Sequence, residues 1–262
     1  MFFKPKKSLG QNFLIDDNIL NLIADIGQVN SEDIILEVGP GTGKLTEKLL
    51  SKNPKKIFVI EKDKDLSKKL KLKFDKKINL ITEDILKVDE EALSNKKMIF
   101  FGNLPYNIST QILVKWIRLN NLNKICKKFI LMFQKEVAER IVAEPGSKKY
   151  GRLSILLGLT TNAKIVMNIS SSAFIPKPKI ESAIVQIIPK KIKKGFNKVI
   201  LEKITQTLFN QRRKQIKSTL SKFGDPIKIC QLLNIEPTKR PEELTLDQYE
   251  KLTNIITNYQ DL

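Results

Sequence analysis

Short apolar runs alternate with amphipathic stretches over the first two-thirds of the 262-residue chain. The apolar runs have the length of buried strands, and the stretches between them place apolar residues at helical spacing. This alternation is typical of a parallel sheet covered by helices on both faces. The predicted strands are 33–38, 57–61, 78–82, 98–102, 129–134, 164–169 and 182–188. The predicted helices between them are 45–52, 63–74, 110–119 and 136–143.

The last two predicted strands are joined by a proline-containing loop, with no helix signal between them. A loop is sufficient to join antiparallel neighbours, whereas parallel neighbours need a longer crossover. Strands 164–169 and 182–188 can therefore form an antiparallel hairpin at the edge of the sheet.

The pattern changes after Pro189, because no further strand signal follows. The predicted helices in this region are 199–210, 212–222, 227–233 and 246–258. A domain boundary is expected near residues 193–195. The sequence thus predicts an α/β domain over 1–193 and a smaller all-α domain over 194–262.

Composition excludes several classes of protein. No apolar run approaches the roughly 18–20 residues of a transmembrane helix, and the charged N-terminus has no apolar stretch behind it, so neither a membrane anchor nor a signal peptide is expected. Cys126 and Cys230 have no metal-ligand neighbours, which fits a reducing cytoplasm. The chain has no histidine, and this excludes imidazole bases, Ser-His-Asp triads and Cys/His zinc sites. No metal site is expected.

Basic residues are in large excess and unevenly distributed. The net charge is +19, which suggests a polyanionic partner, although a lysine-rich proteome would also raise the total. Residues 190–222 hold eleven basic residues and one acid, whereas 223–262 hold four basic residues and seven acids. This concentration predicts a nucleic-acid face at Arg212, Arg213, Lys214 and Lys217, on the helix expected at 212–222.

A glycine-rich loop joins the first predicted strand to a helix, where doubly wound sheets bind nucleotide-like ligands. The loop reads E-x-G-x-G-x-G from Glu37 to Gly43. It matches neither a Walker A loop nor the dinucleotide fingerprint, because position 38 is Val and position 44 is Lys. It resembles motif I of the class I S-adenosylmethionine-dependent methyltransferases. Glycines such as Gly39 and Gly41 allow the backbone to approach a ligand closely.

Acidic residues follow the next two strands. Glu61 closes the second strand, where a carboxylate can accept both hydroxyls of a ribose. Glu83 and Asp84 follow the third strand, where a carboxylate can accept from the amino group of an adenine. The carboxyl ends of neighbouring parallel strands meet at one edge of the sheet, so these groups are expected to converge.

The tetrapeptide Asn103-Leu104-Pro105-Tyr106 follows the fourth strand. The Asn103 side-chain oxygen and the Leu104 carbonyl can accept the two N–H groups of an aromatic amine and direct its lone pair at a methyl donor. Pro105 restrains the backbone, and Tyr106 offers a ring for stacking on a base. An amine loses its proton readily after methyl transfer, so positioning and electrostatics suffice and no general base is needed.

The whole chain resembles the ribosomal RNA adenine dimethyltransferases of the KsgA type, from end to end. N-L-P-Y after the fourth strand is the signature of adenine-N6 methyltransferases that act on nucleic acid. The matching motifs lie at 9–14, 37–43, 61, 84, 102–110, 134–140, 150–154, 174–179, 209–214 and 240–244. The resemblance implies a Rossmann-like class I methyltransferase domain with a seven-stranded sheet, followed by a helical RNA-binding domain.

The resemblance also implies roles for individual residues. Asn12 and Leu14 would line the S-adenosylmethionine pocket from the N-terminal segment. Gly39 would contact the methionine part of the cofactor, Glu61 its ribose and Asp84 its adenine, while Asn103 would mark the junction of cofactor and target base. Tyr106 and Phe174 would sandwich the flipped target adenine. The F-x-P-P-P stretch of the family here has Lys177 in place of one proline.

The implied activity is the formation of two adjacent N6,N6-dimethyladenines near the 3′ end of small-subunit ribosomal RNA, late in subunit assembly. The implied partner is that RNA, in the small ribosomal subunit or its precursor. The enzyme would act as a monomer in the cytoplasm, away from membranes. The basic C-terminal segment would then bind RNA phosphates.

Three alternatives remain open at this stage. An Erm-type enzyme, which dimethylates one adenine of large-subunit RNA, shares the catalytic motifs, although the elements at 209–214 and 240–244 fit the small-subunit type better. A non-catalytic RNA-binding assembly factor on the same fold would not need Glu61, Asp84 and the intact tetrapeptide. A methyltransferase for free amines or protein glutamine would not need the basic segment.

Overall fold

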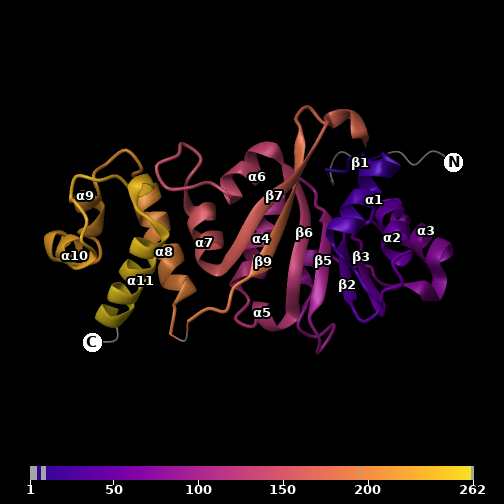
Figure 1. Cartoon of the computed structure of the whole chain (residues 1–262), viewed down its shortest axis with the longest axis horizontal. Helices are drawn as coiled ribbons and strands as arrows, with labels where there is room; N and C mark the ends of the chain where they lie inside the picture. The colour runs from indigo at the N-terminus through magenta and orange to yellow at the C-terminus, as the bar shows by residue number, and fades with distance from the viewer. Residues whose placement is uncertain (1–4, 7–9, 194, 261–262) are drawn as a thin grey trace. The chain divides into compact units, whose positions relative to one another are not determined.

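The computed structural model describes residues 5–6, 10–193 and 195–260 (Figure 1). The chain forms two compact units. Unit 1 consists of 1–138 and 164–189, and unit 2 consists of 139–163 and 190–262. The predicted boundary at 193/194 therefore differs from this division, because the C-terminal segment of unit 2 begins at Lys190 and unit 2 also includes 139–163 from the middle of the chain.

In the described part of the chain, unit 1 is built on a seven-stranded sheet with the order β4-β3-β2-β5-β6-β9-β7. The first five of these strands are parallel, and β9 runs antiparallel to β6. The strands are β2 (Ile34–Val38), β3 (Lys56–Ile60), β4 (Asn79–Ile81), β5 (Met98–Asn103), β6 (Cys126–Gln134), β7 (Thr161–Ile169) and β9 (Ser182–Pro189). All seven predicted strands are confirmed, and β7 and β9 are neighbours at one edge.

Helices flank the sheet on both faces. They are α1 (Asp17–Ile26), α2 (Lys44–Leu50), α3 (Lys64–Phe74), α4 (Ser109–Arg118), α5 (Leu122–Ile125) and α6 (Lys135–Ile141), with 3₁₀ turns η2 (Asp75–Lys77), η3 (Ile85–Lys87) and η4 (Ser171–Ala173). Asp16 and Asp63 cap α1 and α3 through their side chains. Helix α1 is absent from the predicted set, although its Asp cap and helical apolar spacing are visible in the sequence.

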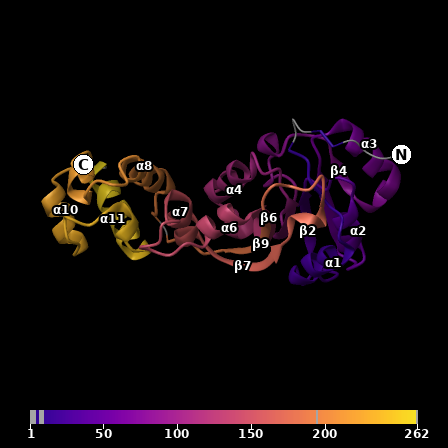
Figure 2. The ribbon, with the colours of Figure 1, turned by 90° about the horizontal axis from the view of Figure 1, so that it is seen from above.

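Alternate residues of the central strands face two different layers. Ile35 and Ile99 belong to a core that includes Leu20 of α1 and Leu49 of α2. Phe100, next to Ile99 in β5, lies edge-on to Trp116 of α4, with ring centroids 5.3 Å apart. Figure 2 shows α1 and α4 on opposite sides of the sheet. The near-continuous apolar sequence of these strands follows from burial on both faces.

A small two-stranded sheet joins distant parts of unit 1. Strand β1 (Phe13–Leu14) pairs antiparallel with β8 (Phe174–Ile175). The sequence does not predict either strand, since two residues are too few to show a period. The pairing holds the N-terminal segment against the chain that leads into β9.

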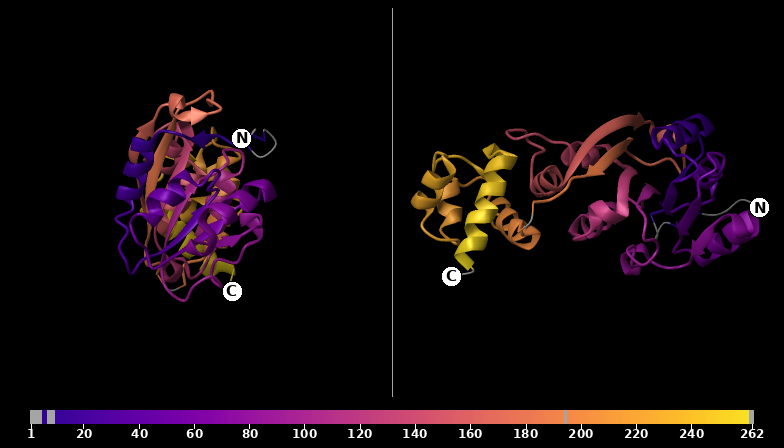
Figure 3. Two further views of the ribbon diagram at one scale, coloured as in Figure 1. Left: turned by 90° about the vertical axis from the view of Figure 1, so that its right-hand side faces the viewer. Right: turned by 60° about the horizontal axis from the view of Figure 1, so that its bottom comes forward.

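Unit 2 is helical in its described residues apart from the first three residues of β7. Its elements are α7 (Arg152–Thr160), α8 (Lys198–Phe209), α9 (Ile216–Leu220), α10 (Pro226–Leu233), η5 (Pro241–Glu243) and α11 (Leu246–Gln260). The last four helices follow one another in orange to yellow in Figure 3. Helix α7 joins this unit because it packs against α8 and α11. Gly158 permits this packing, since a Cβ there would lie 2.7 Å from Leu246.

The predicted helix at 212–222 is wrong over its first half. Residues 211–214 form a turn, and only Ile216–Leu220 is helical. The backbone N–H of Ile216 donates to the carbonyl of Lys239, at 2.7 Å, so this amide does not join a helix that continues from α8. Arg212, Arg213 and Lys214 are therefore presented by a turn.

Candidate active site

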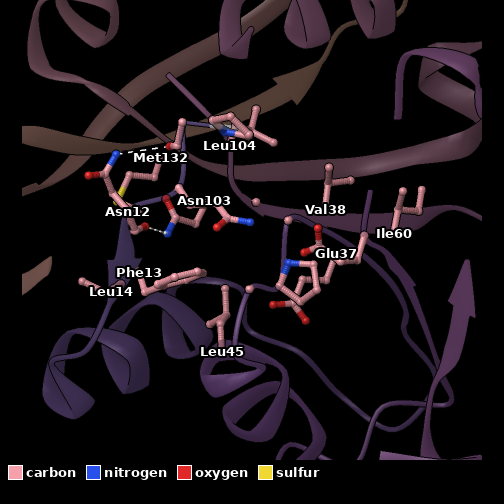
Figure 4. Close-up of a pocket in the computed structure, with 18 of the residues that line it drawn as sticks. Asn12, Phe13, Leu14, Glu37, Val38, Leu45, Ile60, Asn103, Leu104 and Met132 are labelled. Carbon is pink, nitrogen blue, oxygen red and sulfur yellow. Dashed lines mark hydrogen bonds between the residues drawn. The ribbon is translucent and has the colours of Figure 1, made fainter. Parts of the chain in front are cut away.

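A cavity of about 170 Å³ opens beyond the carboxyl ends of β2, β3 and β5 (Figure 4). Register explains the position, because Val38, Ile60 and Gly102 are paired neighbours at these ends. All predicted cofactor-binding residues line the cavity, namely Asn12, Leu14, Gly39, Gly41, Glu61, Asp84 and Asn103. Leu104 and Tyr106 line it as well.

The glycine loop forms one wall and tolerates no side chains at two positions. Gly39 and Gly41 have φ angles of +69° and +59°, a region that favours glycine. A Cβ on Gly39 would lie 3.2 Å from the Asn103 carbonyl oxygen, and one on Gly41 would lie 2.7 Å from the Phe13 ring. The loop therefore approaches both the tetrapeptide and the N-terminal segment closely.

Two buried carboxylates face the cavity from β2 and from the residue after β3. Glu37 is 1% exposed, and its Oε2 has no hydrogen-bond partner among the described residues. Burial raises the pKa of Glu37 to about 7, and the neighbouring charge of Glu61 adds to the rise. Burial also raises the pKa of Glu61, which accepts from the Asp63 amide at 2.8 Å. A positively charged ligand in the cavity would favour the ionised form of both carboxyl groups.

Asp84 is held in place by its own turn. Its Oδ1 accepts from the Leu86 amide at 3.0 Å, which caps η3, and its Oδ2 accepts from Lys62 Nζ at 2.7 Å. The hydrogen bond from Lys62 lowers the pKa of Asp84. The group is therefore an ionised acceptor at the cavity wall.

The Asn103 amide is oriented by the N-terminal segment. Its Nδ2 donates to the Asn12 carbonyl at 3.0 Å (Figure 4), and Asn12 Nδ2 in turn donates to the Gly10 carbonyl at 3.2 Å. With the nitrogen used in this way, the Asn103 Oδ1 is the atom that can accept from a ligand. The Leu104 side chain is buried and needs Gly102, since a Cβ there would lie 2.7 Å from it.

The structure brings Tyr106 to the cavity but not Phe174. The Tyr106 hydroxyl lies 2.5 Å from Ser182 Oγ, and burial raises the pKa of the phenol. Phe174 is 2% exposed and packs in the same core as Leu14, its strand partner. A ring sandwich with Tyr106 would require the Phe174 side chain to leave this core. Sequence reasoning missed Ser182, because only the pairing of β9 with β6 brings it to Tyr106.

The predicted RNA-binding residues in unit 2 are not equivalent. Arg212 donates through Nη2 to the Lys148 carbonyl at 2.9 Å, and its Nε lies 3.4 Å from Glu242 Oε2. Arg213, Lys214 and Lys217 are exposed. Arg212 thus holds the loop before α7, while the other three cations face solvent.

In 5–6, 10–193 and 195–260 there is no cluster of acidic or cysteine side chains that could hold a metal ion. None of the helices described there combines the length and apolar character that crossing a membrane requires.

Comparison with known proteins gives consistent matches. The family model described as Ribosomal RNA adenine dimethylase matches residues 2–261. Ribosomal RNA small subunit methyltransferase A of Pelagibacter ubique is 46% identical, over 100% of this chain and 99% of that protein. The protein of the same name from Wolbachia sp. is 39% identical, over 96% and 93% of the two chains.

Two solved structures share the fold over nearly the whole chain. A dimethyladenosine transferase from Plasmodium falciparum superposes with a TM-score of 0.80 and 28% identity, covering 95% of this chain and 98% of that one. The 23S rRNA methyltransferase ErmE superposes with a TM-score of 0.73 and 20% identity, covering 93% and 99%. The second likeness extends to the fold alone.

Proposed function

The chain belongs to the ribosomal RNA adenine dimethylase family, and from this premise we propose that it dimethylates two adjacent adenines near the 3′ end of small-subunit ribosomal RNA. Each transfer places a methyl group from S-adenosylmethionine on N6, late in subunit assembly. The observation that carries the proposal is the Asn103 amide, which is fixed at the cavity wall with its oxygen available to an amine.

The residues that line the cavity suit S-adenosylmethionine. Glu37 offers a buried carboxylate oxygen that has no hydrogen-bond partner among the described residues, which suits a ligand that carries positive charge. Gly39 and Gly41 leave room for the ligand at the backbone, while Glu61 would accept from the ribose hydroxyls and Asp84 from the adenine amino group. When bound, the cofactor supplies an electrophilic methyl group on a sulfonium.

The tetrapeptide would position the target nitrogen. The lone pair of adenine N6 is delocalised into the ring, which makes the amine a weak nucleophile. The Asn103 Oδ1 and the Leu104 carbonyl oxygen would accept its two N–H groups and direct the lone pair along the transfer axis. Tyr106 would stack on the base. The proton is lost to water after transfer, so the absence of histidine is compatible with this chemistry.

Substrate choice is the part of the proposal that distinguishes it from an Erm-type enzyme. Relatives named small-subunit methyltransferases match 93–100% of this chain at 35–46% identity, and the basic motif at 209–214 is present. The exposed Arg213, Lys214 and Lys217 would bind RNA phosphates. The proposal includes a monomeric enzyme that works in the cytoplasm, and the intact catalytic residues argue against an assembly role alone.

A methyl-transfer assay tests the function. The protein is mixed with methyl-labelled S-adenosylmethionine and either unmethylated small subunits or protein-free large-subunit RNA, and reverse-transcriptase stops are mapped. We expect label and two adjacent stops near the 3′ end of the small-subunit RNA, and label reduced by at least about 100-fold with Asn103→Ala. A single stop in large-subunit RNA would assign the Erm type. Tight subunit binding without label would leave only the assembly role.

A further inference from the structure

A lysine on α4 holds the segment that follows Asp84. Lys115 Nζ donates to the carbonyl oxygens of Ile85, at 3.0 Å, and Val88, at 2.6 Å. It also lies 2.5 and 2.6 Å from the two carboxylate oxygens of Glu90. The adjacent indole, Trp116 Nε1, donates to the same carboxylate at 2.6 Å. One side chain thus joins α4 to both ends of the segment 85–90.

The cluster is largely buried, and the positive charge of Lys115 offsets the negative charge of Glu90. Glu90 is 1% exposed and Trp116 is fully buried, while the Lys115 side chain keeps 22% exposure. A buried carboxylate with a cation and an indole donor is well satisfied, but it becomes costly when one partner is removed. The lysine also caps the C-terminal end of η3, because it donates to the carbonyl oxygen of Val88, the residue that follows η3. The segment 85–90 is therefore tied to α4 by hydrogen bonds at both of its ends.

The two elements joined by Lys115 carry the two halves of the site. Asp84 and Ile85 line the cavity at the start of η3. Helix α4 begins three residues after Tyr106, and Ser109 Oγ donates to the Tyr106 carbonyl at 3.2 Å. The position of the cofactor-adenine acceptor is thus fixed relative to the target-base residues through a single helix.

We propose that Lys115, together with Glu90, is a positioning residue that sets Asp84 for recognition of the cofactor's adenine. The inference rests on the proposed function. A hydrogen bond weakens steeply when donor and acceptor move out of range, so a small displacement of η3 would remove the contact between Asp84 and the exocyclic amine. The consequence is specific, because adenine presents an amino donor at this position and hypoxanthine presents a carbonyl that repels a carboxylate.

Discrimination between adenine and hypoxanthine therefore reports the position of Asp84. The experiment measures calorimetric affinities for S-adenosylhomocysteine and S-inosylhomocysteine. We expect the full-length wild type to prefer the adenine ligand by at least about tenfold, the value of one charge-assisted hydrogen bond. Lys115→Met is expected to reduce this preference to about threefold or less, and Lys115→Arg to restore part of it.

Matched variants separate positioning from general damage. Lys96→Met removes an exposed lysine from the loop between η3 and β5 and is expected to keep the wild-type preference. Glu90→Gln/Lys115→Met removes both charges together, so it avoids an unpaired buried carboxylate if Lys115→Met does not fold. Thermal unfolding is used to verify that each protein is folded at the temperature of the titration.

The outcomes are distinct. A folded Lys115 variant that keeps the wild-type preference overturns the inference and leaves the proposed function intact. Equal weakening of both ligands also overturns it, because it shows that Lys115 only supports the fold. Failure of the wild type to bind S-adenosylhomocysteine would instead overturn the proposed function. Loss of the preference in the Lys115 variants, with Lys96→Met unchanged, supports the positioning role.

Discussion

The side-chain amide of Asn103 has a nitrogen and an oxygen, and the N-terminal segment decides which of them faces a ligand. The Asn12 carbonyl accepts from the nitrogen, so an acceptor is presented to the target amine. The sequence predicts the role of Asn103 from the tetrapeptide, but not the partner that orients it, because the two residues are 91 positions apart. Local motifs identify the reacting residues, whereas their orientation depends on tertiary contacts.

Asn103→Ala is expected to reduce methyl transfer by roughly 100- to 1000-fold, since it removes an acceptor that positions the nucleophile. RNA binding should stay within about threefold of wild type, because the basic turn of unit 2 is unchanged. Single-turnover label transfer and filter binding measure the two quantities. Turnover close to wild type would contradict the mechanism.

Glu37 makes stability depend on pH. Its pKa is raised from 4.5 to about 7 by burial, so the native state keeps a proton that the unfolded state releases. The contribution of Glu37 to the free energy of unfolding should therefore be largest below pH 4.5. It should fall by about 3 kcal/mol in total as the pH rises through 7. Denaturant unfolding of the ligand-free protein at pH 5 and pH 8 measures the change.

Glu37→Gln should lose most of this pH dependence, whereas Glu91→Gln, at an exposed position, should keep it. If both variants show the wild-type difference between pH 5 and pH 8, Glu37 is not the group responsible.

At the scale of elements, the strands were predictable and the basic turn was not. Strands buried on both faces produce long apolar runs, which are visible without any tertiary information. The stretch 211–214 has no helix-breaking residue, and its turn arises because the Ile216 amide bonds to Lys239, a distant partner. The short strands β1 and β8 were missed for the same reason, since each exists only through the other.

The turn gives Arg212 a different role from its neighbours. Arg213→Ala/Lys214→Ala/Lys217→Ala should weaken subunit binding and reduce the slope of log affinity against log salt by about 2, if three phosphate contacts are lost. Titrations at salt concentrations from about 50 to about 200 mM measure the slope, because phosphate contacts change the affinity strongly over this range. Lys64→Ala/Lys68→Ala/Lys76→Ala on and after α3 removes the same charge and serves as the control. An equal change in both triple variants would refute a specific RNA face at the turn.

At the scale of the whole molecule, the sequence predicted an α/β domain and a helical domain. It placed a single boundary between them, after residue 193, so that each domain was one continuous segment. The contacts divide them differently, because α7, which precedes β7 and β9 in the chain, packs with α8 and α11. Helix α7 is apolar on more than one face, since the consecutive residues Ile155, Leu156 and Leu157 are all buried. Its sequence therefore shows no single apolar side from which a partner could be predicted.

A chain that ends at Pro189 retains α7 but loses α8 and α11, which cover it. We expect this fragment to be aggregated or to unfold at least about 5 °C below the full chain, because the apolar side chains of α7 become exposed. Thermal unfolding and size-exclusion chromatography compare the two. A fragment that is monodisperse and unfolds at the temperature of the full chain would show that α7 does not depend on the C-terminal helices.

The pairing of β1 with β8 also has a consequence for protein synthesis. The cavity wall at Phe13 and Leu14 needs Phe174 and Ile175 as strand partners, and these emerge from the ribosome about 160 residues later. At translation rates of about 5–20 residues per second, the nascent chain spends on the order of 8–30 seconds with this wall unsupported. The growing polypeptide should therefore acquire full affinity for its methyl donor only after the second β8 residue has been made and released from the tunnel.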